Sequence, residues 1–220
     1  MKKLSWSKKV LLWAGAIVVL AIALVVLAYA ASVWTDYQWY ASMQQLSVFW
    51  GTVLAQASVW LAFTAAGFAV LLPSARAAWL VVSEKRRFPR STALVCLLLS
   101  GALAWNMARQ WMTFRLAVQG ASFGAKDLQF GIDIGFFVFK LPAFELFAQW
   151  LNGLTTLALI TVGIIIASSR LQLPGTVPAR WPRLGRILAS LGGLLMLAVS
   201  LNFWLAVWRI SYSPAGQIFG

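Results

Sequence analysis

The chain has 220 residues, of which 61% are hydrophobic and only 10% are charged. A soluble domain carries about 45–50% apolar and about 25% charged residues, so this composition excludes a water-soluble globular enzyme. Intrinsic disorder is excluded as well, because disordered chains are poor in hydrophobic residues. The sequence therefore predicts an all-α integral membrane protein with a single transmembrane domain over residues 1–220.

Five stretches are long enough to form transmembrane helices, each of which needs about 20 mostly apolar residues. They lie near residues 10–34, 48–72, 91–114, 144–168 and 187–208. Between the third and the fourth helix, residues 115–143 form the longest connection on the side that we expect to be the outer one.

The net charge of +13 is spread unevenly over the connections. The N-terminal segment and the second and fourth connections hold most of the basic residues: Lys2, Lys3, Lys8, Lys9, Arg76, Lys85, Arg86, Arg87, Arg90, Arg170, Arg180, Arg183 and Arg186. Because Lys and Arg accumulate in cytoplasmic loops, we expect a cytoplasmic N-terminus and, after five crossings, an extracytoplasmic C-terminus. The charge is a topology signal, and no nucleic-acid partner is expected.

The residue types of the usual catalytic and metal sites are scarce. The chain has no histidine, which is the commonest metal ligand and the usual general base near neutral pH. Its single cysteine, Cys96, excludes an intramolecular disulfide and a thiolate zinc cluster. No glycine-rich phosphate loop ending in Gly-Lys-Ser/Thr occurs. We therefore expect no catalytic residues, no ligated cofactor and no metal.

Aromatic and small residues suggest what the helices contact. Most of the 13 Trp residues lie near predicted helix ends, as in the aromatic belts of membrane proteins. A pigment or quinone packed on these rings, without histidine ligation, is the alternative. Small residues recur every four positions at Ser58, Ala62 and Ala66 and at Ala189 and Gly193. This spacing favours tight packing against another helix of this chain or against another subunit.

A few polar residues interrupt the predicted membrane helices. Gln56, Asn106, Asn152 and Asn202 each lie about 9–12 Å inside the predicted outer end of a helix, at 1.5 Å per residue. Arg109 and Gln110 follow Asn106 on the same helical face. One interpretation is hydrogen bonding between helices, with Arg109 reaching outward to the surface. The other is a polar pocket open to the outer side.

The outer connection is unusually rich in glycine and phenylalanine for a soluble loop. This pattern predicts a segment that lies in the membrane interface, or a re-entrant turn backed by protein. Asp127 and Asp133 have Arg115 and Lys126 nearby in the sequence. Since no further acidic cluster accompanies the two carboxylates, we expect them to form salt bridges and not a cation site.

Three motifs give the sequence a specific resemblance. The first is Asp36-Tyr37-Gln38-Trp39-Tyr40 with Ser47-Val48-Phe49-Trp50, the second is ASFG at 121–124 with FGIDIGFFVFKLP at 130–142, and the third is SYSPAGQIFG at 211–220. Together they resemble the N-terminal membrane region of a family of large bacterial multi-pass proteins of unknown function, number one-eight-two among the uncharacterised protein families.

The resemblance implies a bacterial cytoplasmic (inner) membrane protein. Members of the family are several times longer than this chain and continue past the third motif, which implies that the chain is either a fragment or a shortened relative. The family has no accepted catalytic residues, so none can be carried over.

Two functions follow from these observations. The first is a non-catalytic membrane subunit that packs against and stabilises a larger complex, for example a respiratory or photosynthetic one, in contact with lipids and other membrane subunits. The alternative is the membrane half of a transporter or lipid-handling protein with an outward-facing polar pocket. A membrane enzyme fits least well, because the spacing of Asp127, Asp133 and Glu145 is not distinctive.

Overall fold

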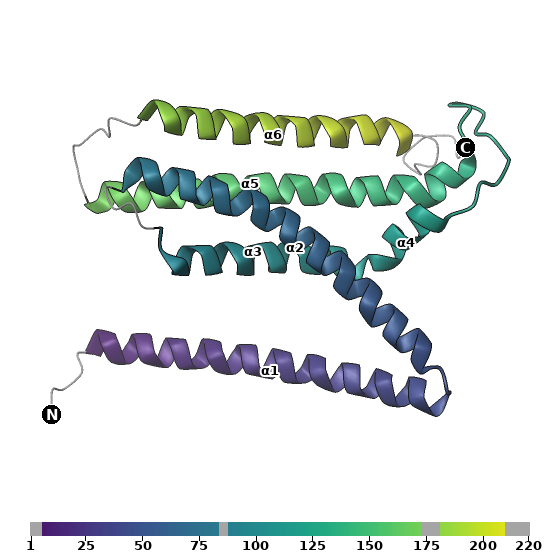
Figure 1. Ribbon diagram of the computed structural model, residues 1–220, viewed down its shortest axis with the longest axis horizontal. Helices are drawn as coiled ribbons and strands as arrows, with labels where there is room; N and C mark the ends of the chain where they lie inside the picture. Colours follow the sequence, from purple (N-terminus) through teal and green to yellow (C-terminus); the bar gives the residue numbers. More distant parts are fainter. Residues whose placement is uncertain (1–5, 84–87, 173–180, 210–220) are drawn as a thin grey trace, which may run out of the picture. The chain divides into compact units, whose positions relative to one another are not determined.

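The structure is a computed structural model that describes residues 6–83, 88–172 and 181–209. Its elements are α1 (Trp6–Ser42), α2 (Leu46–Val82), α3 (Arg90–Arg109), α4 (Trp111–Gln119), the π-helix η1 (Phe136–Lys140), α5 (Leu141–Gln172) and α6 (Trp181–Trp208) (Figure 1). The described residues contain no strand, only an isolated antiparallel bridge between Lys126 and Asp133.

Five helical stretches are long and apolar enough to cross a membrane: Val19–Ser42, Leu46–Val82, Arg90–Arg109, Phe136–Ser168 and Leu184–Trp208. The predicted all-α class and the five candidate spans are therefore confirmed, while the orientation in the membrane stays a prediction. The third sequence motif, at 211–220, lies outside the described residues, as do several basic residues of the topology argument: Lys2, Lys3, Lys85, Arg86, Arg87 and Arg180.

The chain divides into two compact units, residues 1–54 and 55–220, with the boundary inside α2. The prediction of a single transmembrane domain depends on how these two units pack together, so it stays a prediction.

In the first unit, α1 is followed by α2 after a short connection in which Gln44 has φ 58°. The buried ring of Phe49 contacts Tyr37 and Tyr40 across this turn, with ring centroids 5.6 and 5.9 Å apart. The first sequence motif thus forms the aromatic contact of a helical hairpin.

The second unit is built around α5. The helices α5 and α6 run side by side in opposite directions, and α3 packs on α5 (Figure 1). α2 crosses α3, where the indole Nε1 of Trp60 donates a hydrogen bond to the carbonyl oxygen of Gly101 at 2.9 Å. Leu71, Cys96 and Leu154 are fully buried in the core that these helices share. Cys96 therefore acts as a small hydrophobic residue, as its apolar surroundings predict.

Several of the predicted helix boundaries were wrong. The first helix runs from Trp6 to Ser42 and not from 10 to 34. α2 does not end at Leu72 but continues through Pro73 to Val82. Ala75, Ala78 and Val81, beyond the proline, are buried in the core, and this packing outweighs the backbone hydrogen bond that proline cannot form. The fifth helix begins at Trp181 instead of 187.

The predicted helix at 91–114 is broken in two. α3 ends at Arg109, because Gln110 leaves the helical region with φ −96° and ψ 21°, and α4 begins at Trp111. The fourth predicted helix starts at Leu141, before 144, and is preceded by η1. The wider π turn lies directly before Pro142, whose ring and missing N–H do not fit inside a regular α-helix. The irregular part of the outer connection is therefore residues 120–133.

The contact between α2 and α3 allows a test of the helix packing in the second unit. A Cβ added at Gly101 would lie 3.1 Å from the Trp60 ring, whereas one added at Gly163 would meet nothing within 4 Å. We expect Gly101→Leu to destabilise the protein by roughly 1–3 kcal/mol through overpacking. Gly163→Leu, an equal change on the exposed side of α5, should leave stability unchanged. Thermal unfolding in detergent measures both, and equal midpoints for the two variants would contradict this packing.

Candidate functional site

The carboxylate of Asp133 organises the outer connection. Its Oδ2 accepts hydrogen bonds from the Ser122 hydroxyl at 2.5 Å and from the Gly124 N–H at 2.9 Å. Its Oδ1 accepts from the backbone N–H of Phe123 at 3.1 Å and of Gly135 at 2.7 Å. One side chain therefore joins the ASFG part of the second sequence motif to the FGIDIGFFVFKLP part, 9–11 residues further along the chain.

These donors also determine the charge state of Asp133. The Ser122 hydroxyl above all, and then the backbone N–H groups of Phe123, Gly135 and Gly124, lower the pKa of Asp133 below its usual value, against a smaller desolvation effect. The carboxylate stays ionised at neutral pH and both of its oxygens are occupied. It is suited to holding the loop together, and it is not a free general base.

Asp127 stabilises the turn at the tip of the same loop. Its Oδ2 accepts hydrogen bonds from the backbone N–H groups of Gln129 and Phe130, as in an Asx turn. Backbone bonds from Asp127 to Ile132 and from Ile134 to Ala125 close the two sides of the turn. Gly124 and Gly131 have φ of 70° and 67°, which explains the glycines of the motif at these positions.

The predicted salt bridges of this segment are replaced by other contacts. In the part of the chain that the structure describes, none of Arg115, Lys126, Asp127 and Asp133 forms an ion pair. Instead, the Arg115 Nε donates to the Gln119 Oε1 at 3.2 Å, and its guanidinium lies 6.0 Å from the centroid of the Trp111 ring. Backbone N–H groups and the Ser122 hydroxyl donate to the two carboxylates in place of basic side chains, and sequence spacing alone does not reveal this competition.

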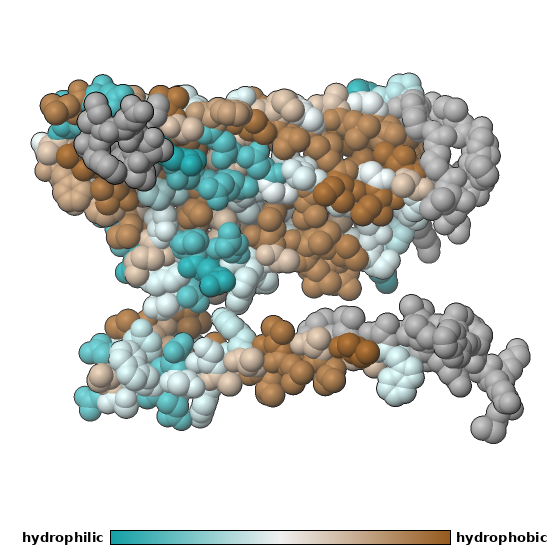
Figure 2. Space-filling view, turned by 180° about the vertical axis from the view of Figure 1, so that it is seen from behind, coloured by the Kyte–Doolittle hydropathy of each residue, from teal (hydrophilic) through white to brown (hydrophobic). Residues whose placement is uncertain are grey.

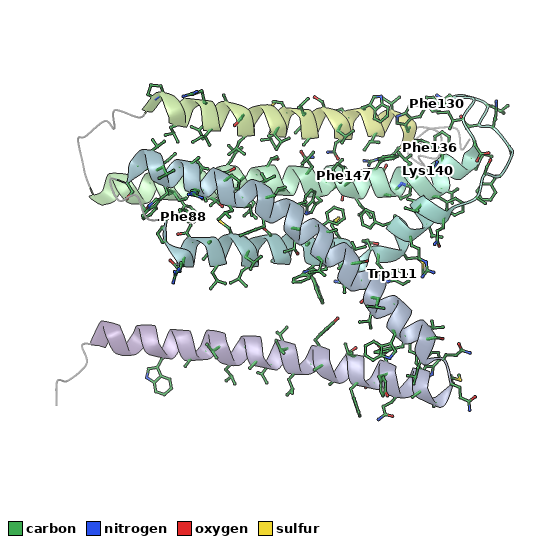
Figure 3. All side chains as sticks on the ribbon, viewed as in Figure 1. Phe88, Trp111, Phe130, Phe136, Lys140 and Phe147 are labelled. Carbon is green, nitrogen blue, oxygen red and sulfur yellow. The ribbon has the colours of Figure 1, made fainter. Side chains whose placement is uncertain are left out.

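An aromatic cluster anchors the loop to the ends of α5 and α6. Phe137, Leu141, Ala148 and Leu205 are buried together, and Phe130, Phe136 and Trp208 pack on them. The ring centroids of Phe130 and Trp208 are 5.0 Å apart, and those of Phe136 and Trp208 are 5.9 Å apart. Figure 3 shows Phe130, Phe136 and Lys140 gathered at this end of the unit. The phenylalanines of the motif thus have a packing role.

An ion pair that the sequence did not reveal lies beside this cluster. The Glu145 Oε1 and the Arg209 Nε are 2.6 Å apart, with side chains 19% and 43% exposed. The pair joins the first turns of α5 to the residue that follows α6. The only sequence signal was that both charges lie near the outer ends of their helices, and the pairing itself depends on the antiparallel contact of α5 and α6.

The six residues of the predicted polar pocket differ in burial, and the pocket itself stays a prediction. Asn106, Arg109 and Gln110 are exposed, while Gln56, Asn152 and Asn202 are half-buried. The equal depths were derived from a helix ending at 114. With α3 ending at Arg109, Asn106 lies only about 4.5 Å from the helix end, at 1.5 Å per residue. The exposed residues Asn106, Arg109 and Gln110 lie at the end of α3, whereas the half-buried Gln56, Asn152 and Asn202 lie on α2, α5 and α6.

Residues that could hold a metal are sparse. The parts of the chain that the structure describes contain no cluster of three or more His, Cys, Asp or Glu side chains. The site at this end of the unit is therefore a folded loop, an aromatic cluster and an ion pair. This arrangement can hold elements together or present a surface.

The loop gives a pH-dependent prediction. The Asp133 pKa is lowered in the folded loop, so its contribution to stability is complete above the ordinary carboxyl pKa of about 3.9 and is lost as the pH falls through the lowered value. We expect Asp133→Asn to reduce hydrogen-exchange protection of the Phe123, Gly124 and Gly135 amides at neutral pH. Acidification of the unmodified protein should reduce the same protection factors.

Asp127→Ala, which removes the acceptor of the second turn, is the control for this loop. It should expose the Gln129 and Phe130 amides and leave the three amides at Asp133 protected. Unchanged protection in Asp133→Asn would show that the carboxylate does not hold the loop.

Comparison with known proteins gives relatives but no solved structure that matches. A UPF0182 protein of Synechococcus sp. (strain JA-3-3Ab) is 34% identical over 86% of this chain and 22% of its own length. A UPF0182 protein of Thermobifida fusca (strain YX) is 29% identical over 87% of this chain and 21% of its own length. No solved structure matches this chain. The chain therefore spans about a fifth of the length of the curated relatives that it matches.

The profile of the family matches nearly the whole sequence, over residues 13–220, including all three motifs. In the second motif, Ser122, Gly124, Gly131 and Asp133 have the structural roles described above. The chain belongs to the Uncharacterised protein family (UPF0182).

Proposed function

We propose that this chain is a non-catalytic module of the bacterial cytoplasmic membrane that packs against further membrane helices and stabilises a larger assembly. In lipid, helix association relies on close packing, because lipid tails are as apolar as the side chains that they would replace. A packing module should therefore present small residues, in a row, on a face that its own helices leave open.

The observation that carries this proposal is the open row of small residues on α6. Gly185, Ala189 and Gly193 follow one another at four-residue spacing, and all three are exposed. A Cβ added at Gly185 or Gly193 would meet nothing within 4 Å. By contrast, Gly67 and Gly101 lie against Ser100 and Trp60 inside the unit. The chain thus uses small residues for close helix contacts, whereas Gly185 and Gly193 on α6 lack such a contact with the described residues.

A second row has the same character. Ser58, Ala62 and Ala66 on α2 are also exposed. On the face that Figure 2 shows, large hydrophobic areas lie around hydrophilic patches, as lipid or helix contact requires. Relatives that are several times longer than this chain would supply further helices within one polypeptide, whereas a short chain would meet them in another subunit.

The predicted topology belongs to the same proposal. The 20 residues of α3 span about 30 Å, which is the thickness of the hydrocarbon core, and Arg90 and Arg109 stand at its two ends. Both guanidinium groups would then lie at the level of the lipid headgroups. α4, with Arg115 beside Trp111, would follow the outer interface, and the N-terminus would be cytoplasmic.

Ala189→Leu tests this function, because a leucine in the row blocks close approach of another helix. We expect the native assembly, extracted in mild detergent, to shrink on native electrophoresis while the unfolding midpoint of the chain is unchanged. Ala206→Leu, the same change at an exposed alanine of α6 outside the row, is the matched control.

Two results would argue against the proposal. An assembly of unchanged size in Ala189→Leu would mean that the row contacts only lipid. A lower unfolding midpoint with unchanged size would mean that another helix of the same chain covers the row. Mass spectrometry of the assembly distinguishes a longer polypeptide from a separate subunit.

A further inference from the structure

The ion pair between Glu145 and Arg209 fixes how α5 and α6 are aligned. Since the helices run in opposite directions, a step toward higher numbers on α5 corresponds to a step toward lower numbers on α6. Seven residues beyond Glu145 lies Asn152, and seven residues before Arg209 lies Asn202. Seven residues make about two turns, so each asparagine lies on the same face of its helix as its charged residue, about 10 Å along.

Burial on the two helices supports this alignment. Asn152 is flanked on its face by Ala148 and Thr155, which are both fully buried. Asn202 is flanked by Ala198 and Leu205, which are fully buried too. Ala148 and Leu205 belong to one cluster, so these faces of α5 and α6 meet each other. The two asparagines therefore lie at the same level of the contact between the helices.

The hydrogen bonds of the two side chains are incomplete. The Asn152 Oδ1 is buried and accepts no hydrogen bond. The Asn202 Nδ2 donates to the carbonyl oxygen of Ala198, one turn back in its own helix, at 2.8 Å. That carbonyl already takes part in the backbone hydrogen bonding of α6, so the side-chain bond adds little to the stability of the helix. An unsatisfied acceptor in a membrane interior is costly, because lipid supplies no donor.

We propose that Asn152 and Asn202 form a polar contact between α5 and α6 that has two states. In one state the Asn202 amide donates to Ala198, as in the structure. In the other it turns to donate to the Asn152 Oδ1, which satisfies the buried acceptor and joins the two helices about two turns below the ion pair. The Asn202 amide has two N–H groups, and at least one of them keeps a partner in either state, so the helices can loosen at this level without leaving the amide unpaired.

A double-mutant cycle tests the contact. We expect Asn152→Leu and Asn202→Leu each to change the unfolding equilibrium constant in detergent about threefold, as is typical of polar contacts between membrane helices. The double variant should change it no more than either single variant, because the same contact is lost. Gln149→Leu, which removes an exposed amide from α5, is the control and should show no coupling with Asn202→Leu. Additive effects at 152 and 202, or no effect of either, would overturn the proposal.

Cross-linking checks the alignment separately, even where a leucine variant folds poorly. In a Cys96→Ala background, cysteines introduced at 152 and 202 should join readily under mild oxidation. Cysteines at 152 and 195, offset by about two turns, should not. Preferred cross-linking of the offset pair would refute the alignment on which the contact rests. Neither test depends on the assembly state that Ala189→Leu reports.

Discussion

Lipid offers no hydrogen-bond partner, and this constraint governs the whole structure. Backbone groups must be satisfied within helices, so helical structure continues through Pro73 in α2. Hydroxyl groups obey the same rule. Thr52, Ser74, Ser100 and Thr161 all donate to the carbonyl four residues earlier in their own helix. Few polar groups are left to join one helix to another, and those that do, such as Trp60 on Gly101, lie where glycine allows close approach.

The second sequence motif has a structural explanation that needs no catalysis. Its carboxylate accepts hydrogen bonds from the Ser122 hydroxyl and three backbone N–H groups. Two of its glycines, Gly124 and Gly131, adopt positive φ, and three of its phenylalanines pack on Trp208. Motifs of this kind are often taken as active sites. Here the hydrogen-bonding and aromatic groups of the motif serve to fold a short segment onto the ends of two helices.

The sequence predicted the five apolar helices, because length and composition decide whether a segment can cross a membrane. It did not predict the break at Gln110 or the continuation through Pro73, since both depend on tertiary packing of apolar residues that look alike in sequence. The residues of the outer connection were recognised as unusual, but Asp133 was assigned a charged partner. Its real partners are mostly backbone amides, which every residue carries and which leave no mark in the sequence. The pairing of Glu145 with Arg209, 64 positions apart in the numbering, could not be predicted either, because it depends on the antiparallel contact of α5 and α6.

The bonds of the Asp133 loop have a consequence for the order of assembly. All of them join residues between 122 and 135, whereas the aromatic anchor and the ion pair need Trp208 and Arg209. A ribosome delivers the loop long before it delivers the last helix, and contacts between close neighbours in sequence form fastest. The loop can thus close by itself while α5 enters the membrane. When α6 is inserted, it packs against a loop that has already folded, and its insertion completes the structure at that end.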